Sequence, residues 1–541
     1  MIIVPLLMSG WSPTFVRLPP FSADYFCLEN DILHIESRWA WPEGKAMVKD
    51  ARQPVIVGVG EIADRPVHVM DALDPAGLMT AALEVAERDA GAALLPMLDR
   101  LDIINEISWP YPDPCREITD RLGVRSVDAR YRPVGGQTPT LALHEAALAI
   151  QSGEIEVAAI CGGEAEHSVR RAGREGVTLP WPEQIANFRP IRGGDFQSPL
   201  ARALELTTPV NVYPLYENAT RAAWGQSLAE GQRESATIWA NNARIGAGRD
   251  TAWIRDEVDA DAILSDAGGN RLIAWPYRKL MVANPIVNQG AAVILTSLGR
   301  AREAGIPEHR LVYVHGGAAA DEPRDILARE RYDGSVVMTA VLDAARRLSG
   351  GNFDAVELYS CFPCVPKMAR RALSLGEDAD LTVTGGLTFF GAPLNDYMTH
   401  AIVAMVGRLR DRCGLGLLYG QGEYVTKHHA LVLGSSPPAS PLADQFRLEE
   451  VEARAATAGP PLATSYLGPA TLEAFTIPFD RDERPRFGVM IGRNPAGERV
   501  AARIDADDHA TMTLLMRDQP AVGINGIVVE GENDVPCWRV S

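Results

Sequence analysis

The feature that most constrains the fold is an alternation of short apolar segments with helical patterns, repeated in two successive halves of the chain. In the first half, the apolar run PVIVGVG from Pro54 to Gly60 predicts a strand, and residues 76–90 have a helical pattern. A second unit follows, with a helix expected over residues 141–151 and a strand over residues 156–160. Such alternation predicts stacked α/β layers.

The second half repeats this plan, so we expect a duplicated α/β architecture. Its expected strands cover residues 311–314, 353–358, 416–420 and 430–434, its expected helices cover residues 335–348, 365–375 and 396–410, and residues 290–298 are interpreted as a passage from helix to strand. Residues 165–280 are richer in charge and tryptophan, which predicts an insertion with its own helices near residues 217–245.

The Pro/Ser segment SSPPASP, residues 435–441, predicts a linker before a different kind of domain. Short strands expected over residues 470–478, 485–493, 498–504 and 522–530 predict a small β-barrel, for which the oligonucleotide-binding (OB) type is one candidate. The predicted organisation is a loose tail over 1–46, a first half over 47–300 that includes the insertion, a second half over 301–435, a linker over 436–460 and an OB-like domain over 461–541.

Charge and cysteine content restrict the classes of partner. The formal net charge of -18, without a Lys/Arg run, makes nucleic acid an unexpected partner, and no apolar run reaches the roughly 20 residues of a membrane helix. Seven scattered cysteines favour a reducing compartment, so we expect a cytoplasmic protein. Cys361 and Cys364 have the spacing of half a zinc knuckle, but no second pair accompanies them, and we expect no metal.

Four segments, in order, resemble the landmark loops of the thiolase superfamily, closest to its sterol-carrier-protein thiolase branch and to thiolase-like proteins with an added C-terminal domain. The segments are Val134 to Pro139 (VGGQTP), Glu357 to Phe362 (ELYSCF), Gly385 to Pro393 (GGLTFFGAP) and Gly416 to Gly422 (GLLYGQG). The resemblance covers about residues 50–435. It implies the duplicated thiolase fold of α/β/α/β/α layers, an acyl-coenzyme A thioester as substrate or ligand, and no other cofactor.

The resemblance also implies that the thiolase chemistry has been lost. The nucleophilic cysteine of the family would fall at Gly136 or its neighbour, its activating histidine at Ala392 and its second cysteine at Leu418. Alanine can neither accept nor donate a proton, and the loss of members of a catalytic unit removes several orders of magnitude of rate. Cys161 and Cys361 are expected to be plain buried cysteines.

Other residues carried over from the resemblance could still form a site. Tyr359 stands where the family places a residue that orients a water or a carbonyl, and Gly136 and Gly420 match the positions whose backbone amides form the oxyanion hole. His428 is a second catalytic candidate, although the sequence KHH is equally typical of a solvent-facing loop. The remaining expected pocket residues are Gln137, Gly391, Tyr397 and Tyr424, whereas His400 is expected to be a core histidine.

Three functions remain open at this point. The first is an acyltransferase-family protein that handles acyl-CoA through a rearranged site. The second is a retro-aldolase acting on a β-hydroxyacyl-CoA, which needs a base and an oxyanion site but no covalent nucleophile. The third is a non-catalytic acyl-CoA-binding protein in which glycines persist for close packing. Family members are commonly dimers, so a homodimer is also among the expectations.

Overall fold

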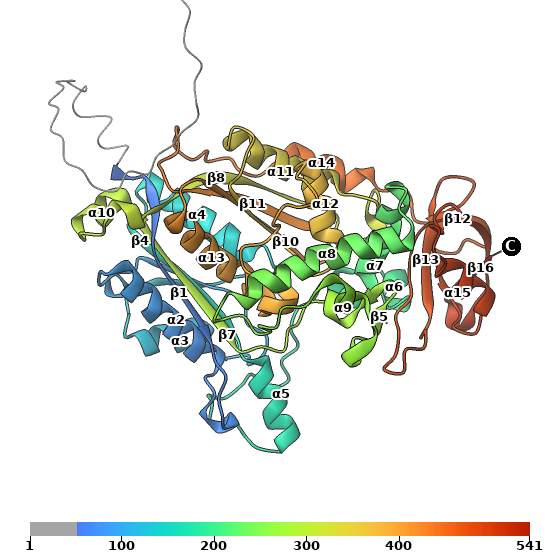
Figure 1. The fold of residues 1–541 in the computed structure, drawn as a ribbon, viewed down its shortest axis with the longest axis horizontal. Coiled ribbons are helices and arrows are strands. Elements are labelled where there is room, and N and C mark those ends of the chain that lie inside the picture. Colours follow the sequence, from blue (N-terminus) through green and yellow to red (C-terminus); the bar gives the residue numbers. More distant parts are fainter. Residues whose placement is uncertain (1–50, 541) are drawn as a thin grey trace, which may run out of the picture. The chain divides into compact units, whose positions relative to one another are not determined.

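The computed structural model describes residues 51–540. Backbone contacts divide the chain into two units, Met1–Ala46 and Met47–Ser541. The tail expected over 1–46 lies outside the described residues, and the architecture below is that of the second unit (Figure 1). In the described part, no helix has the length and apolar composition needed to cross a bilayer.

A nine-stranded sheet joins the two halves in the order β3-β2-β4-β7-β1-β8-β11-β10-β9. Its strands are β1 (Pro54–Ala63), β2 (Arg100–Ile103), β3 (Asp128–Tyr131), β4 (Val157–Glu164), β7 (Gln289–Ser297), β8 (Val312–Asp321), β9 (Ala355–Leu358), β10 (Leu415–Gly422) and β11 (Lys427–Gly434). The halves meet where Val55 pairs with Tyr313 and Ile56 with Val312 in the antiparallel contact of β1 with β8.

Helices form layers on and between the two halves of the sheet. The helices in these layers are α2 (Pro75–Ala90), α3 (Pro114–Leu122), α4 (Thr138–Ser152), α10 (Leu298–Glu303), α11 (Val336–Leu348), α12 (Cys364–Ala372) and α13 (Tyr397–Asp411). The central helices α4 and α13 pack on each other and on strands of both halves, α2 covers the first half, and α11 and α12 cover the second (Figure 1). These are the stacked α/β layers that the alternating pattern predicts.

Local signals at the two ends of α2 explain why this helix can be predicted from the sequence. The Asp74 side chain caps the helix by accepting a hydrogen bond of 2.9 Å from the Gly77 amide, and Pro75 occupies the first helical position. The helix ends at Gly91, whose φ of 70° lies in the left-handed region. The buried face of α2 then packs on β1 and β7.

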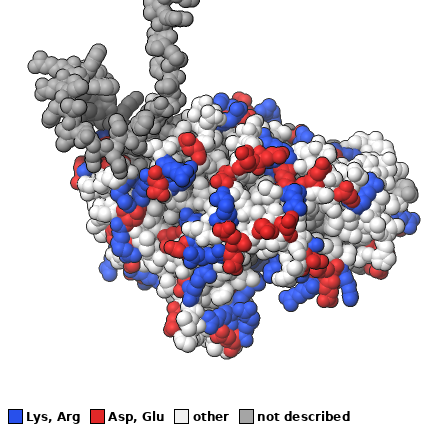
Figure 2. All heavy atoms as spheres, in the orientation of Figure 1, with Lys and Arg blue, Asp and Glu red and all other residues white. Residues whose placement is uncertain are grey.

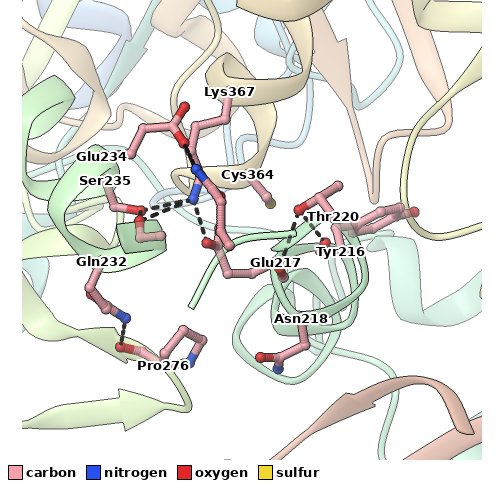
Figure 3. A network of polar contacts seen from close by, with 12 residues as sticks. Tyr216, Glu217, Asn218, Thr220, Gln232, Glu234, Ser235, Pro276, Cys364 and Lys367 are labelled. Carbon is pink, nitrogen blue, oxygen red and sulfur yellow. Dashed lines mark hydrogen bonds and ion pairs between the residues drawn. The ribbon is translucent and has the colours of Figure 1, made fainter. Parts of the chain in front are cut away.

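The insertion contributes five helices and a two-stranded sheet. They are α5 (Glu166–Glu175), α6 (Pro199–Ala203), α7 (Pro209–Ala223), α8 (Leu228–Ala247) and α9 (Ala260–Leu264), with β5 (Leu272–Ala274) and β6 (Tyr277–Arg278). A buried ion pair between Lys367 of α12 and Glu217 of α7 fastens the insertion to the second half (Figure 3).

The C-terminal segment forms the β-barrel that the short strands predict. It is a closed barrel in the order β12-β13-β14-β16-β15, built from β12 (Gly468–Thr476), β13 (Gly488–Arg493), β14 (Arg499–Ile504), β15 (Asn525–Val529) and β16 (Cys537–Val540), with α15 (His509–Leu515) beside it. The buried Arg499 side chain donates hydrogen bonds to the carbonyls of Leu327 (3.1 Å) and Glu330 (3.1 Å), so the barrel is fastened to the α/β body.

Two local expectations are wrong. Residues 289–297 form a strand throughout, because β7 pairs with β1 and β4 and is buried on both faces, which removes any alternation from its sequence.

The segment expected as a linker contains α14 (Glu449–Ala458) and is attached to the α/β body. The backbone amide and carbonyl of Leu442 form hydrogen bonds of 2.7 and 2.9 Å with the Gln151 side chain. Its Pro/Ser composition marks irregular backbone, not a loose connection.

Candidate functional site

An apolar cavity of about 350 Å³ lies where all four landmark segments meet the insertion. Its walls come from the loop before α4, from the ends of β9 and β10, and from the segment Leu387 to Asn395. The insertion closes it with residues 191–193 and 207–213. The volume and the mainly apolar lining are those of a small-molecule site.

Tyr359 directs an unpaired phenol into this cavity. The side chain is 93 % buried, and its hydroxyl makes no hydrogen bond with any residue of 51–540. Burial raises the pKa of the phenol, which therefore stays protonated and acts as a hydrogen-bond donor. The Tyr397 ring packs edge-on against the Tyr359 ring, with 5.7 Å between the ring centres. The Tyr397 hydroxyl donates a hydrogen bond of 2.7 Å to the buried Glu357 carboxylate, so the ring that supports Tyr359 is itself fixed.

Gly136 lies directly beside this hydroxyl and has no room for a side chain. A Cβ atom there would be 2.6 Å from the Tyr359 hydroxyl oxygen and 2.5 Å from the carbonyl oxygen of Gln421. The phenol and this carbonyl therefore occupy the space that a side chain at position 136 would need. The Gly136 amide makes no hydrogen bond within residues 51–540 and precedes α4, where the helix dipole favours negative charge.

Asn395 fixes the loop that carries Gly136. Its side-chain oxygen accepts a hydrogen bond of 3.0 Å from the Gly135 amide, and its nitrogen donates one of 3.0 Å to the Asn105 carbonyl. Asn395, like Gln421, lines the cavity and was missed by the sequence analysis. Gln421 directly follows Gly420 in the fourth landmark, and that adjacency was the available signal.

Cys361 also lines the cavity, next to Gln421. The Gln421 side-chain nitrogen lies 3.3 Å from its sulfur. Burial nevertheless raises the pKa of the Cys361 thiol to about 12, so it is protonated at neutral pH and is a poor nucleophile. Ala392 lines the same cavity and supplies no proton acceptor at the position of the family histidine.

The structure brings only some of the sequence-predicted residues to the cavity. Tyr359, Gly136 and Tyr424 line it, and the Tyr424 hydroxyl donates a hydrogen bond of 2.5 Å to the Thr207 carbonyl. Gly420 and Gly391 do not: a Cβ at Gly420 would be 3.0 Å from the Gln137 Cα, and one at Gly391 would be 2.4 Å from the Gln289 side-chain oxygen. Both are positions of close packing.

Gln137 and Tyr397 also lie outside the cavity lining, although both are buried next to it. Gln137 precedes the first residue of α4, and its side-chain oxygen would be 2.2 Å from a Cβ at Gly422. Gln137 therefore fills the space between the first and fourth landmark segments, and Tyr397 supports Tyr359 through ring packing alone.

His428 is neither in a loop nor at the cavity. It lies in β11, is 99 % buried, and has Tyr419 Oη 2.7 Å from Nδ1 and Glu322 Oε1 3.2 Å from Nε2. The letters KHH are polar, but the pairing of β11 with both β8 and β10 places them in the interior. His400 is likewise a buried histidine, between Glu61 and Asp396.

The crowding at Gly136 predicts that the nucleophile cannot be restored by one substitution. Gly136→Cys is expected to lower the free energy of unfolding by about 1–3 kcal/mol, because the new side chain overlaps the phenol and the Gln421 carbonyl. Urea denaturation measures the change. Gly173→Cys is the control, since nothing lies within 4 Å of a Cβ at that position. Wild-type stability of Gly136→Cys would contradict the crowding.

The C-terminal residues 449–533 match the family model of the additional C-terminal domain of thiolase-like protein type 1. Over the whole chain, the structure resembles a monomeric SCP2-thiolase-like protein type 1 from Mycobacterium smegmatis, with 26 % identity, a TM-score of 0.77, and coverage of 91 % of this chain and 100 % of that one. No curated protein matches the sequence.

Two more distant structures share the fold. The Ltp2-ChsH2(DUF35) aldolase has 17 % identity and a TM-score of 0.53, and the dimeric peroxisomal thiolase of Saccharomyces cerevisiae has 12 % identity and a TM-score of 0.51. Each of these two alignments covers 71 % of this chain and 98 % of the other chain. At these identities the likeness concerns the fold alone.

Proposed function

Because the chain is a member of the thiolase superfamily with an additional C-terminal domain, we propose that it binds acyl thioesters such as acyl-CoA in the cavity beside Tyr359, without forming an acyl-cysteine. The observation that carries the proposal is the pair of unpaired donors, the Tyr359 hydroxyl and the Gly136 amide, next to each other at an apolar cavity. Neither donor has a hydrogen-bond partner within residues 51–540, and one thioester carbonyl oxygen could accept a hydrogen bond from each.

The rest of the cavity suits the acyl part of such a ligand. Apolar side chains of Val134, Val210, Val282 and Leu387 line the same cavity as the two donors. Burial of an acyl chain against such walls contributes about 0.8 kcal/mol per methylene. The protonated Cys361 and the crowded Gly136 supply no nucleophile, which supports binding without covalent transfer.

The test is calorimetric titration of the full chain with CoA and a series of acyl-CoAs. Binding is expected for acyl-CoA, and Tyr359→Phe should weaken it about tenfold, because one hydrogen bond to the carbonyl is worth roughly 0.5–1.5 kcal/mol. Tyr332→Phe is the matched control, since this buried phenol donates to the Ile326 carbonyl away from the cavity. Absence of binding to every thioester would refute the proposal.

A second candidate, retro-aldol cleavage of a β-hydroxyacyl thioester, is favoured by one further observation. Glu423 is the only carboxylate among the described residues that line the cavity. Two donors at the carbonyl would stabilise the enolate, and a carboxylate could accept the proton of the β-hydroxyl. Glu423 is ion-paired with Arg324 and with Lys427 (3.0 Å), which opposes this role. Cleavage of the Cα–Cβ bond of a β-hydroxyacyl-CoA, which gives an aldehyde or ketone and a shorter acyl-CoA, would establish this reaction if it disappears in Glu423→Gln.

A further inference from the structure

Exposed apolar side chains are concentrated around α5. Seven of the thirteen large apolar side chains exposed within residues 51–540 lie in the segments 67–73 and 177–191. The most exposed are Val67 (81 %) and Ile191 (58 %), followed by Met70 and Ile185. A grouping of this kind on a water-facing surface marks an interaction site more often than scattered single residues do.

The two segments belong to one surface, which we call the α5 lobe and define as residues 64–73 and 166–192. The Arg171 side chain donates hydrogen bonds to the carbonyls of Pro66 (3.0 Å) and Val67 (2.9 Å), and the Trp181 indole donates one of 2.9 Å to the Ala72 carbonyl. A small core that includes Val69 and Leu179 lies underneath. The segments around residues 66–72 and 171–181 are therefore held together as one lobe.

The charge of the lobe differs from that of the chain. It holds six arginines and five acidic residues, whereas the whole chain has a formal charge of -18. Arg65, Arg174 and Arg192 are exposed and form no ion pair with a carboxylate among residues 51–540. Figure 2 shows the projection over α5, at the bottom of the view, with white and blue surface and red patches between them.

We propose that the α5 lobe docks onto an anionic lipid surface. Apolar side chains would enter the boundary between headgroups and acyl chains, while the guanidinium groups of Arg174 and Arg192 would contact lipid phosphates. This mode of contact needs no spanning helix. It departs from the expectation of no membrane partner, which rested only on the absence of a spanning segment.

The lobe is continuous with the cavity, because Ile191 and Arg192 belong to both. A lipophilic ligand could pass between a bilayer and the cavity along this edge with little exposure to bulk water. The docking itself does not depend on the proposed acyl-thioester function, since it is measured without such a ligand, and either proposal can fail alone.

The experiment is co-sedimentation of the full chain with phosphatidylcholine vesicles that contain either no or half phosphatidylglycerol. The wild type should partition onto the anionic vesicles, and the partition should fall with added salt as the arginine–phosphate attraction is screened. Val67→Ser/Phe188→Ser/Ile191→Ser should weaken the partition about tenfold, and Arg174→Gln/Arg192→Gln should remove its preference for phosphatidylglycerol.

The control is Leu467→Ser/Ile527→Ser, which removes exposed apolar side chains from the barrel. This variant should partition like the wild type. The proposal is overturned if the wild type sediments with neither vesicle, or if the barrel variant loses as much partition as the lobe variant.

Discussion

Lys367→Met is expected to lower the free energy of unfolding by about 3–5 kcal/mol, because it leaves a buried carboxylate without its cation. Lys367 is fully buried and reaches Glu217 of α7 and, at 3.0 Å, the Ser235 hydroxyl of α8 (Figure 3). The second Glu217 oxygen accepts a hydrogen bond of 2.7 Å from Tyr277, so the carboxylate cannot turn toward water. Chemical denaturation measures the loss.

Two comparisons separate charge from shape in this experiment. Lys367→Met/Glu217→Gln keeps an acceptor for Tyr277 and removes both charges, so it should recover much of the lost stability. Arg116→Gln breaks a pair whose members are 77 % and 67 % exposed, and it should cost less than about 1 kcal/mol. A small effect of Lys367→Met, equal to that of Arg116→Gln, would show that the buried pair is not the fastening of the insertion.

The stability of the protein is expected to fall by about 3 kcal/mol between pH 6.5 and 9 through His400 alone. Its ring has Glu61 Oε1 2.8 Å from Nδ1 and Asp396 Oδ2 3.4 Å from Nε2. Burial alone would lower the pKa of His400, but these two carboxylates outweigh it and raise the pKa to about 9. Arg249, together with His400 and Thr251, holds the pKa of Glu61 at about 2 despite its burial.

The sign follows from the difference between the two states. The folded protein holds the His400 proton more tightly than the unfolded chain, whose histidine pKa is about 6.5. The stability that protonated His400 contributes is therefore fully present below pH 6.5 and is lost as the pH rises through 9. Each unit of pKa difference between the folded and unfolded states corresponds to about 1.4 kcal/mol. Denaturation at pH 6 and pH 9.5 measures it.

His400→Gln should remove this part of the pH dependence and should destabilise the protein most at pH 6. His309→Gln is the control, because that side chain is exposed and should leave the pH profile unchanged. If His400→Gln kept the wild-type slope between pH 6.5 and 9, the imidazolium would not be the group that titrates.

The elements that were predicted from the sequence are those specified by local signals. Asp74 and Pro75 begin α2 through their own hydrogen bonding and ring geometry, and the apolar run at Pro54 gives β1 in any context that buries it. The strand β7 was misread because a strand buried on both faces loses its alternation, and that burial is a property of its neighbours.

The site divides in the same way. The sequence by itself determined the order of the layers, the barrel and the four landmark loops, since each depends on periodicity or on residues adjacent in the chain. Only the tertiary structure decided that the Tyr359 phenol occupies the space beside Gly136, that His428 is buried against Glu322, and that Asn395 holds the Gly135 loop. Contacts between residues distant in sequence depend on side-chain packing at a resolution of tenths of an ångström, which no local pattern carries.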